Sequence, residues 1–169
     1  MAQIITNYVA TFNDMDEGNE DVVFKDNVAE AFGNGGQDRF TFEQYVSNID
    51  MGDDNDTVIF TNLAGAATII LGDGDDTVPG AISAEGLYAD YIAAIDAVEG
   101  NDGVIINGAG TVDLGNGADQ LIANGYIAEV TATGTSANTV ALNAGGGPVT
   151  LAEGNDVITA NAWVLGLTA

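Results

Sequence analysis

The chain of 169 residues contains no cysteine and no histidine. Disulfides and thiol catalysis are therefore excluded, and so are histidine general-base chemistry and the usual zinc and copper sites. The side-chain ligands that remain are oxygens, which suit hard cations such as calcium. With no nucleophile and base to combine, the sequence also predicts that the protein is not an enzyme.

Basic residues are nearly absent, because only Lys25 and Arg39 stand against 26 acidic residues, for a formal net charge of −24. Nucleic acid is excluded as a partner, since phosphate contacts need clusters of Lys or Arg. No continuous apolar run reaches about 18 residues, so we expect no membrane insertion. The first residues also lack the basic and long apolar regions of a cleaved signal peptide. We therefore expect a protein that stays inside the cell or leaves by a route that does not read its N-terminus.

Glycine and small apolar residues are abundant. The chain has 23 glycines, 46% hydrophobic residues and a mean hydropathy of +0.15. This composition indicates one packed domain with a modest core and many tight turns, where glycine accepts positive φ.

The stretch Leu71 to Val78, LGDGDDTV, belongs to a repeat. We call Asp76 its anchor: glycines lie four and two residues before it, and an apolar residue lies two after it. The other anchors are Glu20, Asp38, Asp56, Asp102, Asp119, Asn138 and Asp156. Successive anchors are separated by 18, 18, 20, 26, 17, 19 and 18 residues.

A period near 18 with Gly-Asp turns predicts an all-β fold, a right-handed parallel β-solenoid of about eight coils. Each coil would contain two short strands and two turns. Apolar residues two positions after every anchor, and mostly again two later, match the alternation of a strand with one buried side. The first set is Val22, Phe40, Val58, Val78, Val104, Leu121, Val140 and Ile158, and the second is Phe24, Phe42, Phe60, Gly80, Ile106, Ala123, Leu142 and Ala160.

Three segments divide the predicted single domain: an opening strand in residues 1–15, calcium-binding coils in 16–159 and an uncharged apolar tail in 160–169. The interval of 26 residues places an insert near 81–97. Leu87, Tyr91, Ile95 and Val98 are spaced as one face of a short helix, and a bulged loop is the alternative.

The repeat stacks acidic residues, and this predicts a metal. Neighbouring strands lie about 4.8 Å apart, where two carboxylates repel by about 3.5 kcal/mol at an effective dielectric constant near 20. Several such pairs approach the whole stability of a domain, about 5 to 15 kcal/mol, so a counter-charge is needed. The predicted calcium ligands are Glu20, Asp38, Asp56, Asp76, Asp102, Asp119 and Asp156, with Asp53 and Asp73 as second donors. About four to six calcium ions would bring the charge to about −16 to −12. A metal-free acidic solenoid, with Asp and Asn forming turns and ladders, is the alternative.

The repeat resembles the calcium-binding nonapeptide GGxGxDxUx of the repeat-in-toxin (RTX) proteins. Gly72, Gly74, Asp76 and Val78 match it, as do Gly115, Gly117, Asp119 and Leu121; Gly33, Gly36, Asp38 and Phe40 match with Asn34 in the second glycine place. Glu20 and Asn138 replace the aspartate, and Asp54 replaces a glycine. The family usually carries the motif on both turns of a coil, whereas here one turn has it, so we expect a β-roll-like fold with one column of ions.

The resemblance implies type I secretion, an extracellular or cell-surface location and folding on contact with external calcium. The repeats fill nearly the whole chain, which leaves no room for a catalytic domain. We therefore expect a structural protein that joins copies of itself head to tail into a filament, sheath or surface layer. A calcium-stabilised adhesin or ice-binding module is one alternative, with cell-surface polysaccharide as a further candidate partner. A repeat fragment of a larger RTX exoprotein is the other.

Overall fold

The computed structural model describes residues 1–13, 18–61, 65–79 and 91–168. This part of the chain contains 18 strands and no helix. Accordingly, none of the described residues belongs to a helix able to cross a membrane.

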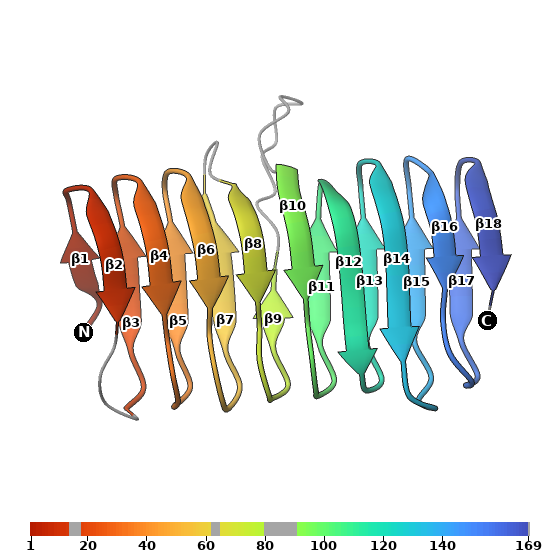
Figure 1. Cartoon of the computed structure of the whole chain (residues 1–169), viewed down its shortest axis with the longest axis horizontal. Helices are drawn as coiled ribbons and strands as arrows, with labels where there is room; N and C mark the ends of the chain where they lie inside the picture. The colour runs from red at the N-terminus through yellow and green to blue at the C-terminus, as the bar shows by residue number, and fades with distance from the viewer. Residues whose placement is uncertain (14–17, 62–64, 80–90, 169) are drawn as a thin grey trace.

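The strands form two nine-stranded parallel sheets that face each other (Figure 1). Odd-numbered strands make sheet A: β1 Gln3–Ile5, β3 Asp21–Phe24, β5 Arg39–Phe42, β7 Thr57–Phe60, β9 Thr77–Val78, β11 Gly103–Ile106, β13 Gln120–Ala123, β15 Thr139–Leu142 and β17 Val157–Ala160. Even-numbered strands make sheet B: β2 Val9–Asn13, β4 Val28–Phe32, β6 Val46–Asp50, β8 Ala66–Ile70, β10 Tyr91–Asp96, β12 Gly108–Asn116, β14 Ile127–Thr133, β16 Gly146–Thr150 and β18 Val164–Thr168. The chain alternates between the sheets, so the predicted parallel β-solenoid of about eight turns is confirmed.

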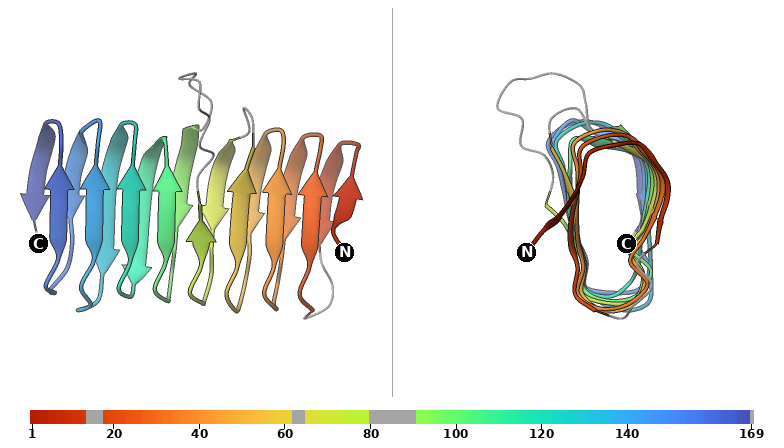
Figure 2. Two further views of the ribbon diagram at one scale, coloured as in Figure 1. Left: turned by 180° about the vertical axis from the view of Figure 1, so that it is seen from behind. Right: turned by 90° about the vertical axis from the view of Figure 1, so that its left-hand side faces the viewer.

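The coils superimpose when viewed along the rod (Figure 2, right). Each strand pairs in register with the strand one coil away, so equivalent side chains stack in columns. One inward column of sheet A runs through Val22, Phe40, Val58, Val78, Val104, Leu121 and Val140, all with no exposed surface. The period-two pattern therefore identified the core of sheet A correctly.

Aromatic residues concentrate at the N-terminal end of this core. The Phe24 and Phe42 rings stack with centroids 4.8 Å apart, and Phe42 stacks on Phe60 at 5.8 Å. Further along the rod the same column continues with Ile106, Ala123 and Leu142. The predicted inward positions Gly80 and Ala160 differ: Gly80 lies outside the described residues, and Ala160 is exposed on the last coil.

The predicted helix near 81–97 is wrong where the structure describes it, because Tyr91 to Asp96 form strand β10. Ile92 and Ile95 are buried there, and β10 pairs with β8 and β12 in the regular register. A spacing of three to four residues also arises from an irregular strand that buries residues on one side, which explains the error. Leu87 lies outside the described residues, and Val98 follows the strand with a φ of 60°.

The two end segments each contribute to the sheets. Residues 1–13 supply β1 and β2 rather than one opening strand, and Val164–Thr168 of the apolar tail is β18. The tail is therefore the outermost strand of sheet B.

Candidate metal centre

The anchors form a straight column along one edge of the rod. Six of the eight anchors are almost fully buried, at 0–2% exposure: Asp38, Asp56, Asp76, Asp102, Asp119 and Asn138. Glu20 and Asp156, at the two ends of the column, are half-buried. In every coil the anchor Oδ1 accepts a hydrogen bond from the backbone N–H of the preceding anchor, at 2.7–3.0 Å. We call this the anchor ladder; it runs from the N–H of Glu20 to the carboxylate of Asp156.

The glycines of the repeat position this ladder. Gly72 has a φ of 99° and Gly74 a φ of 154°, in the region that side chains disfavour. A Cβ atom at Gly72 would also overlap the carbonyl oxygen of Gly52 on the preceding coil. The tight turn thus needs glycine both for its backbone angles and for close stacking. Where the repeat departs from glycine, Asn34 and Asp54 also adopt a positive φ, of 72° and 79°.

The second carboxylate oxygen distinguishes aspartate from asparagine in this column. The Oδ2 atoms of Asp56, Asp76, Asp102, Asp119 and Asp156 are buried and have no hydrogen-bond partner. A buried oxygen without a partner costs about 1 to 3 kcal/mol, and more if it is charged. Asn138 occupies the same position and makes the same Oδ1 bond to the N–H of Asp119. The ladder itself therefore needs only an amide, and the aspartates add buried negative charge.

Burial disfavours that charge and raises the pKa of four anchors. The pKa rises from 3.8 to about 8 for Asp56 and Asp102, and to about 6 for Asp76 and Asp119. Desolvation is the largest cause in each case, the backbone hydrogen bond opposes it, and neighbouring carboxylates raise the pKa of the first three further. Without a cation, Asp56 and Asp102 therefore retain their protons at neutral pH.

The predicted second donors lie outside this column. Asp53 and Asp73 stack in register in a row of bridges that runs from Gly35 to Asn116, but both are exposed. Within the described ranges, no three acidic side chains converge as a metal-binding cluster. The structure brings the anchors together as a line, one per coil, rather than as a cage of carboxylates.

A second ladder beside the anchors was missed by the sequence analysis. Residues directly before the anchors accept backbone hydrogen bonds in the opposite sense: Asn55 from Asp75, Asp75 from Asn101 and Asn101 from Ala118, at 2.8–3.0 Å. The recurrence of Asn or Asp one residue before the anchor was the available signal. These contacts stabilise the turn without a metal ion.

The opposite turns carry a different ladder, which was also missed. Asn161 Nδ2 donates to Asn143 Oδ1 at 2.7 Å, and Asn143 Nδ2 donates to Asn124 Oδ1 at 2.9 Å. Toward the N-terminus the same place holds the Lys25–Glu43 ion pair at 2.9 Å. The stacked buried acids thus lie on one edge only among the described residues.

Calcium fits the anchor column through its oxygen chemistry. Each unpartnered Oδ2 can supply one hard oxygen ligand of the kind that calcium prefers. Asp56, Asp76, Asp102, Asp119 and Asp156 are the residues that would hold the ions. The bound cation would supply the positive charge that the column lacks.

Comparison of the chain with protein-family models, with curated proteins and with solved structures gives no match.

Replacing Asp102 by Asn should stabilise the calcium-free protein at pH 8. The amide keeps the Oδ1 acceptor for the N–H of Asp76 and removes a buried charge, as Asn138 does naturally. We expect a gain of about 1 to 3 kcal/mol in the free energy of unfolding, measured by urea titration in EGTA. In saturating calcium the sign should reverse, because the variant lacks one ligand oxygen.

The matched control is the reciprocal change Asn138→Asp, which extends the line of carboxylates. It should destabilise the calcium-free protein by a similar amount. If both variants shift the urea midpoint in the same direction in EGTA, the buried charge is not what limits stability.

Proposed function

We propose that this protein is a secreted calcium-binding structural protein that assembles end to end into an extracellular filament, sheath or surface layer. The observation that carries the proposal is the pair of open sheet edges at each end of the rod. The outermost strands are β1 and β2 at one end and β17 and β18 at the other. Unpaired strand edges accept further strands unless something covers them.

Apolar side chains lie on the strands that form these open edges. Leu167 is 56% exposed although it stands in an inward column, above the buried Val149. At the other end of the same column, Phe12 lies over the buried Ala31. Ala160 and Ile5 likewise belong to one column of sheet A. Each end therefore presents the cross-section of the core.

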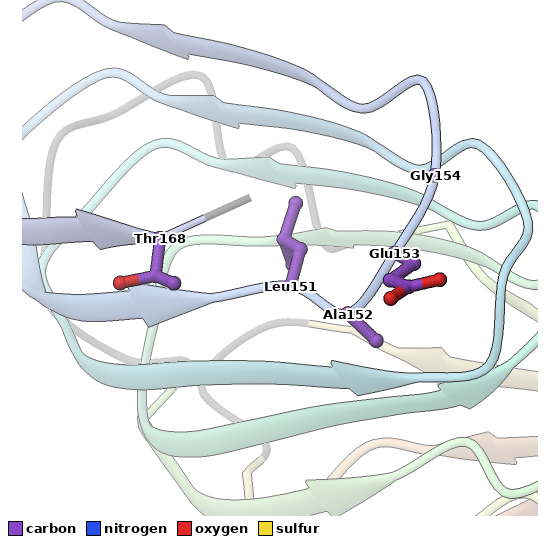
Figure 3. Close-up of a pocket in the computed structure, with 5 residues that line it drawn as sticks. All are labelled: Leu151, Ala152, Glu153, Gly154 and Thr168. Atoms are coloured by element: carbon purple, nitrogen blue, oxygen red, sulfur yellow. The ribbon is translucent and has the colours of Figure 1, made fainter.

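A shallow recess marks the C-terminal end face (Figure 3). It is lined by Leu151, Ala152, Glu153, Gly154 and Thr168, from the end of β16, the following turn and β18. In the interior of the rod, the next coil packs on such turns, as when Asp73 N–H donates to the carbonyl of Gly52 at 2.9 Å. The recess has the position that a further coil would occupy.

The two ends fit each other when a second copy is shifted along the rod axis. Because all strands are parallel, β1 of a second copy can pair with β17 and β2 with β18 in the same direction as every interior pair. This head-to-tail contact uses two different surfaces and does not close, so it generates a filament. In this arrangement Phe12 of the second copy packs on Leu167.

Calcium has two roles in the proposal. It neutralises the buried anchor carboxylates, and it lowers the repulsion between copies that each carry a charge of −24. Low calcium inside the cell would keep the chain loose for type I secretion, as the resemblance to RTX proteins implies, and external calcium would fold it.

Two alternatives have less support. An ice-binding face needs a continuous threonine ladder, but the column containing Thr57 and Thr77 also holds Arg39, Gly103 and Gln120. Catalysis is not proposed, because the end recess offers one carboxylate and one hydroxyl in a chain without His or Cys.

Negative-stain electron microscopy in millimolar calcium and in EGTA tests the proposal. Fibres or sheets with calcium and their loss with EGTA are expected. Monodisperse rods at every protein concentration would contradict end-to-end assembly, and fibres that persist in EGTA would contradict the role of calcium.

A further inference from the structure

Aromatic residues recur at regular intervals on the edge opposite the anchors. The residues that precede or begin the strands of sheet B stand in register, one per coil, and alternate between an aromatic and a small or polar residue. We call them the aromatic row: Tyr8, Asn27, Tyr45, Gly65, Tyr91, Gly108, Tyr126, Gly145 and Trp163. An aromatic residue thus recurs at every second coil.

Four aromatic side chains of the row that the structure describes are exposed to solvent. Tyr8 is 60% exposed, Tyr45 48%, Tyr126 50% and Trp163 67%. Two coils correspond to about 9.6 Å along the rod. Glycine between two rings leaves no side chain there. A Cβ at Gly145 would meet the carbonyl oxygen of Trp163 at 2.5 Å.

At the C-terminal end, two rings combine across this glycine. Tyr126 and Trp163 approach with ring centroids 6.4 Å apart and planes tilted by 48°. The Asn124, Asn143 and Asn161 amides are exposed on the same turns, two residues before the row positions, and are linked in a ladder. Aromatic faces therefore lie beside a line of uncharged donors and acceptors.

We infer that the aromatic row is a binding site for a neutral, linear polysaccharide. Sugar rings offer apolar C–H faces that pack on aromatic rings and hydroxyls that pair with amides. An extended chain of β-linked hexoses presents like faces at alternate sugars, which suits rings at alternate coils. The charge of −24 disfavours polyanions. An apolar protein surface fits less well, because glycine and amides interrupt the rings.

Depletion on microcrystalline cellulose and on chitin tests the inference, with tubes lacking polymer to correct for protein that sediments alone. The wild-type chain should be retained on at least one of the two polymers. Trp163 is the only tryptophan, so its emission should also shift on addition of cellohexaose or chitohexaose.

Tyr126→Ala should weaken retention roughly 2- to 12-fold, the value of one aromatic contact of about 0.5 to 1.5 kcal/mol. Tyr126→Phe should bind as the wild type, because the ring remains, and Tyr45→Ala should weaken binding like Tyr126→Ala. Asn27→Ala, at a ringless position of the same row, is the matched control and should leave binding unchanged.

Three results would overturn the inference. One is no retention on either polymer together with unchanged tryptophan emission. Another is equal binding by wild type, Tyr45→Ala and Tyr126→Ala. The third is a side-by-side clustering of rods that Tyr126→Ala abolishes and that polysaccharide does not change. That result would assign the row to contacts between copies of this chain.

Discussion

Calcium-free protein should be more stable at pH 5.5 than at pH 8, by on the order of 5 kcal/mol in the free energy of unfolding. Most acidic proteins lose stability on acidification because their carboxylates have lowered pKa values in the folded state. The anchor column reverses that relation, since burial raises the pKa of Asp56 and Asp102 to about 8 and of Asp76 and Asp119 to about 6.

The sign follows from proton uptake. In the unfolded chain these carboxyls have a pKa near 3.8, so they are ionised throughout this range. Between pH 3.8 and about 8 the folded state binds more protons, and stability therefore falls as pH rises through that window. For each of the two groups with a pKa near 8, the free energy of unfolding falls by about 1.4 kcal/mol per pH unit. This holds over the pH range in which the group is protonated in the folded state and ionised in the unfolded state.

Calcium should remove this advantage of low pH, because protons and the cation compete for the same oxygens. Each ion at a concentration of 100 times its Kd adds about 2.7 kcal/mol, so four to six ions would add more than about 10 kcal/mol at pH 8. Urea unfolding followed by circular dichroism at both pH values, in EGTA and in calcium, measures the effect. EGTA at pH 8 should give the lowest urea midpoint of the four conditions.

The double variant Asp56→Asn with Asp102→Asn is the control for that experiment. It lacks the two groups with the highest pKa, so its stability in EGTA should change much less between pH 5.5 and pH 8. An equal pH dependence in the double variant would assign the effect to exposed carboxylates. Calcium-free protein equally stable at both pH values would refute the account of the buried column.

Much of the fold was predictable because a solenoid repeats its constraints. The columns at Val22 and Phe24 recur in every coil, so period and alternation together specify strand, turn and direction of stacking. The prediction failed at Tyr91 to Asp96, where one coil alone had to be interpreted. There the apolar spacing of three to four was ambiguous between helix and strand, and no repeat resolved it.

The candidate site was predictable in its residues but not in its chemistry. The sequence identifies the anchors and predicts that they stack, yet it treats them as a row of ionised carboxylates that repel one another. The structure instead buries them and satisfies Oδ1 through the N–H of the neighbouring anchor, as between Asp56 and Asp76. Which carboxylate oxygen remains unpartnered depends on side-chain orientation, which spacing cannot give. The same limit applies to the predicted second donors Asp53 and Asp73, because their exposure could not be derived from spacing either.

Leu167→Lys should abolish end-to-end assembly while leaving the rod folded. Leu167 stands in the inward column that continues, in the proposed joint, with Phe12 of the next copy. In a single rod it is 56% exposed, so a lysine there can extend into water. In the joint, the ammonium group would be buried against apolar side chains without a partner. We expect the protein concentration needed for fibres to rise about 100-fold or more, equivalent to about 2.7 kcal/mol.

The matched control is Leu165→Lys on the same strand. Leu165 is 75% exposed and stands in another column, which continues through Gly147 to the exposed Ala128, whereas Leu167 stands over the buried Val149. The charge change is identical, so effects of net charge on repulsion between copies are the same in both variants. Sedimentation velocity in calcium should find single rods for Leu167→Lys and polymers for Leu165→Lys. If both variants polymerise like the wild type, copies do not join through the core of the end coil. If neither variant polymerises, charge repulsion between copies, rather than packing of side chains, controls the joint.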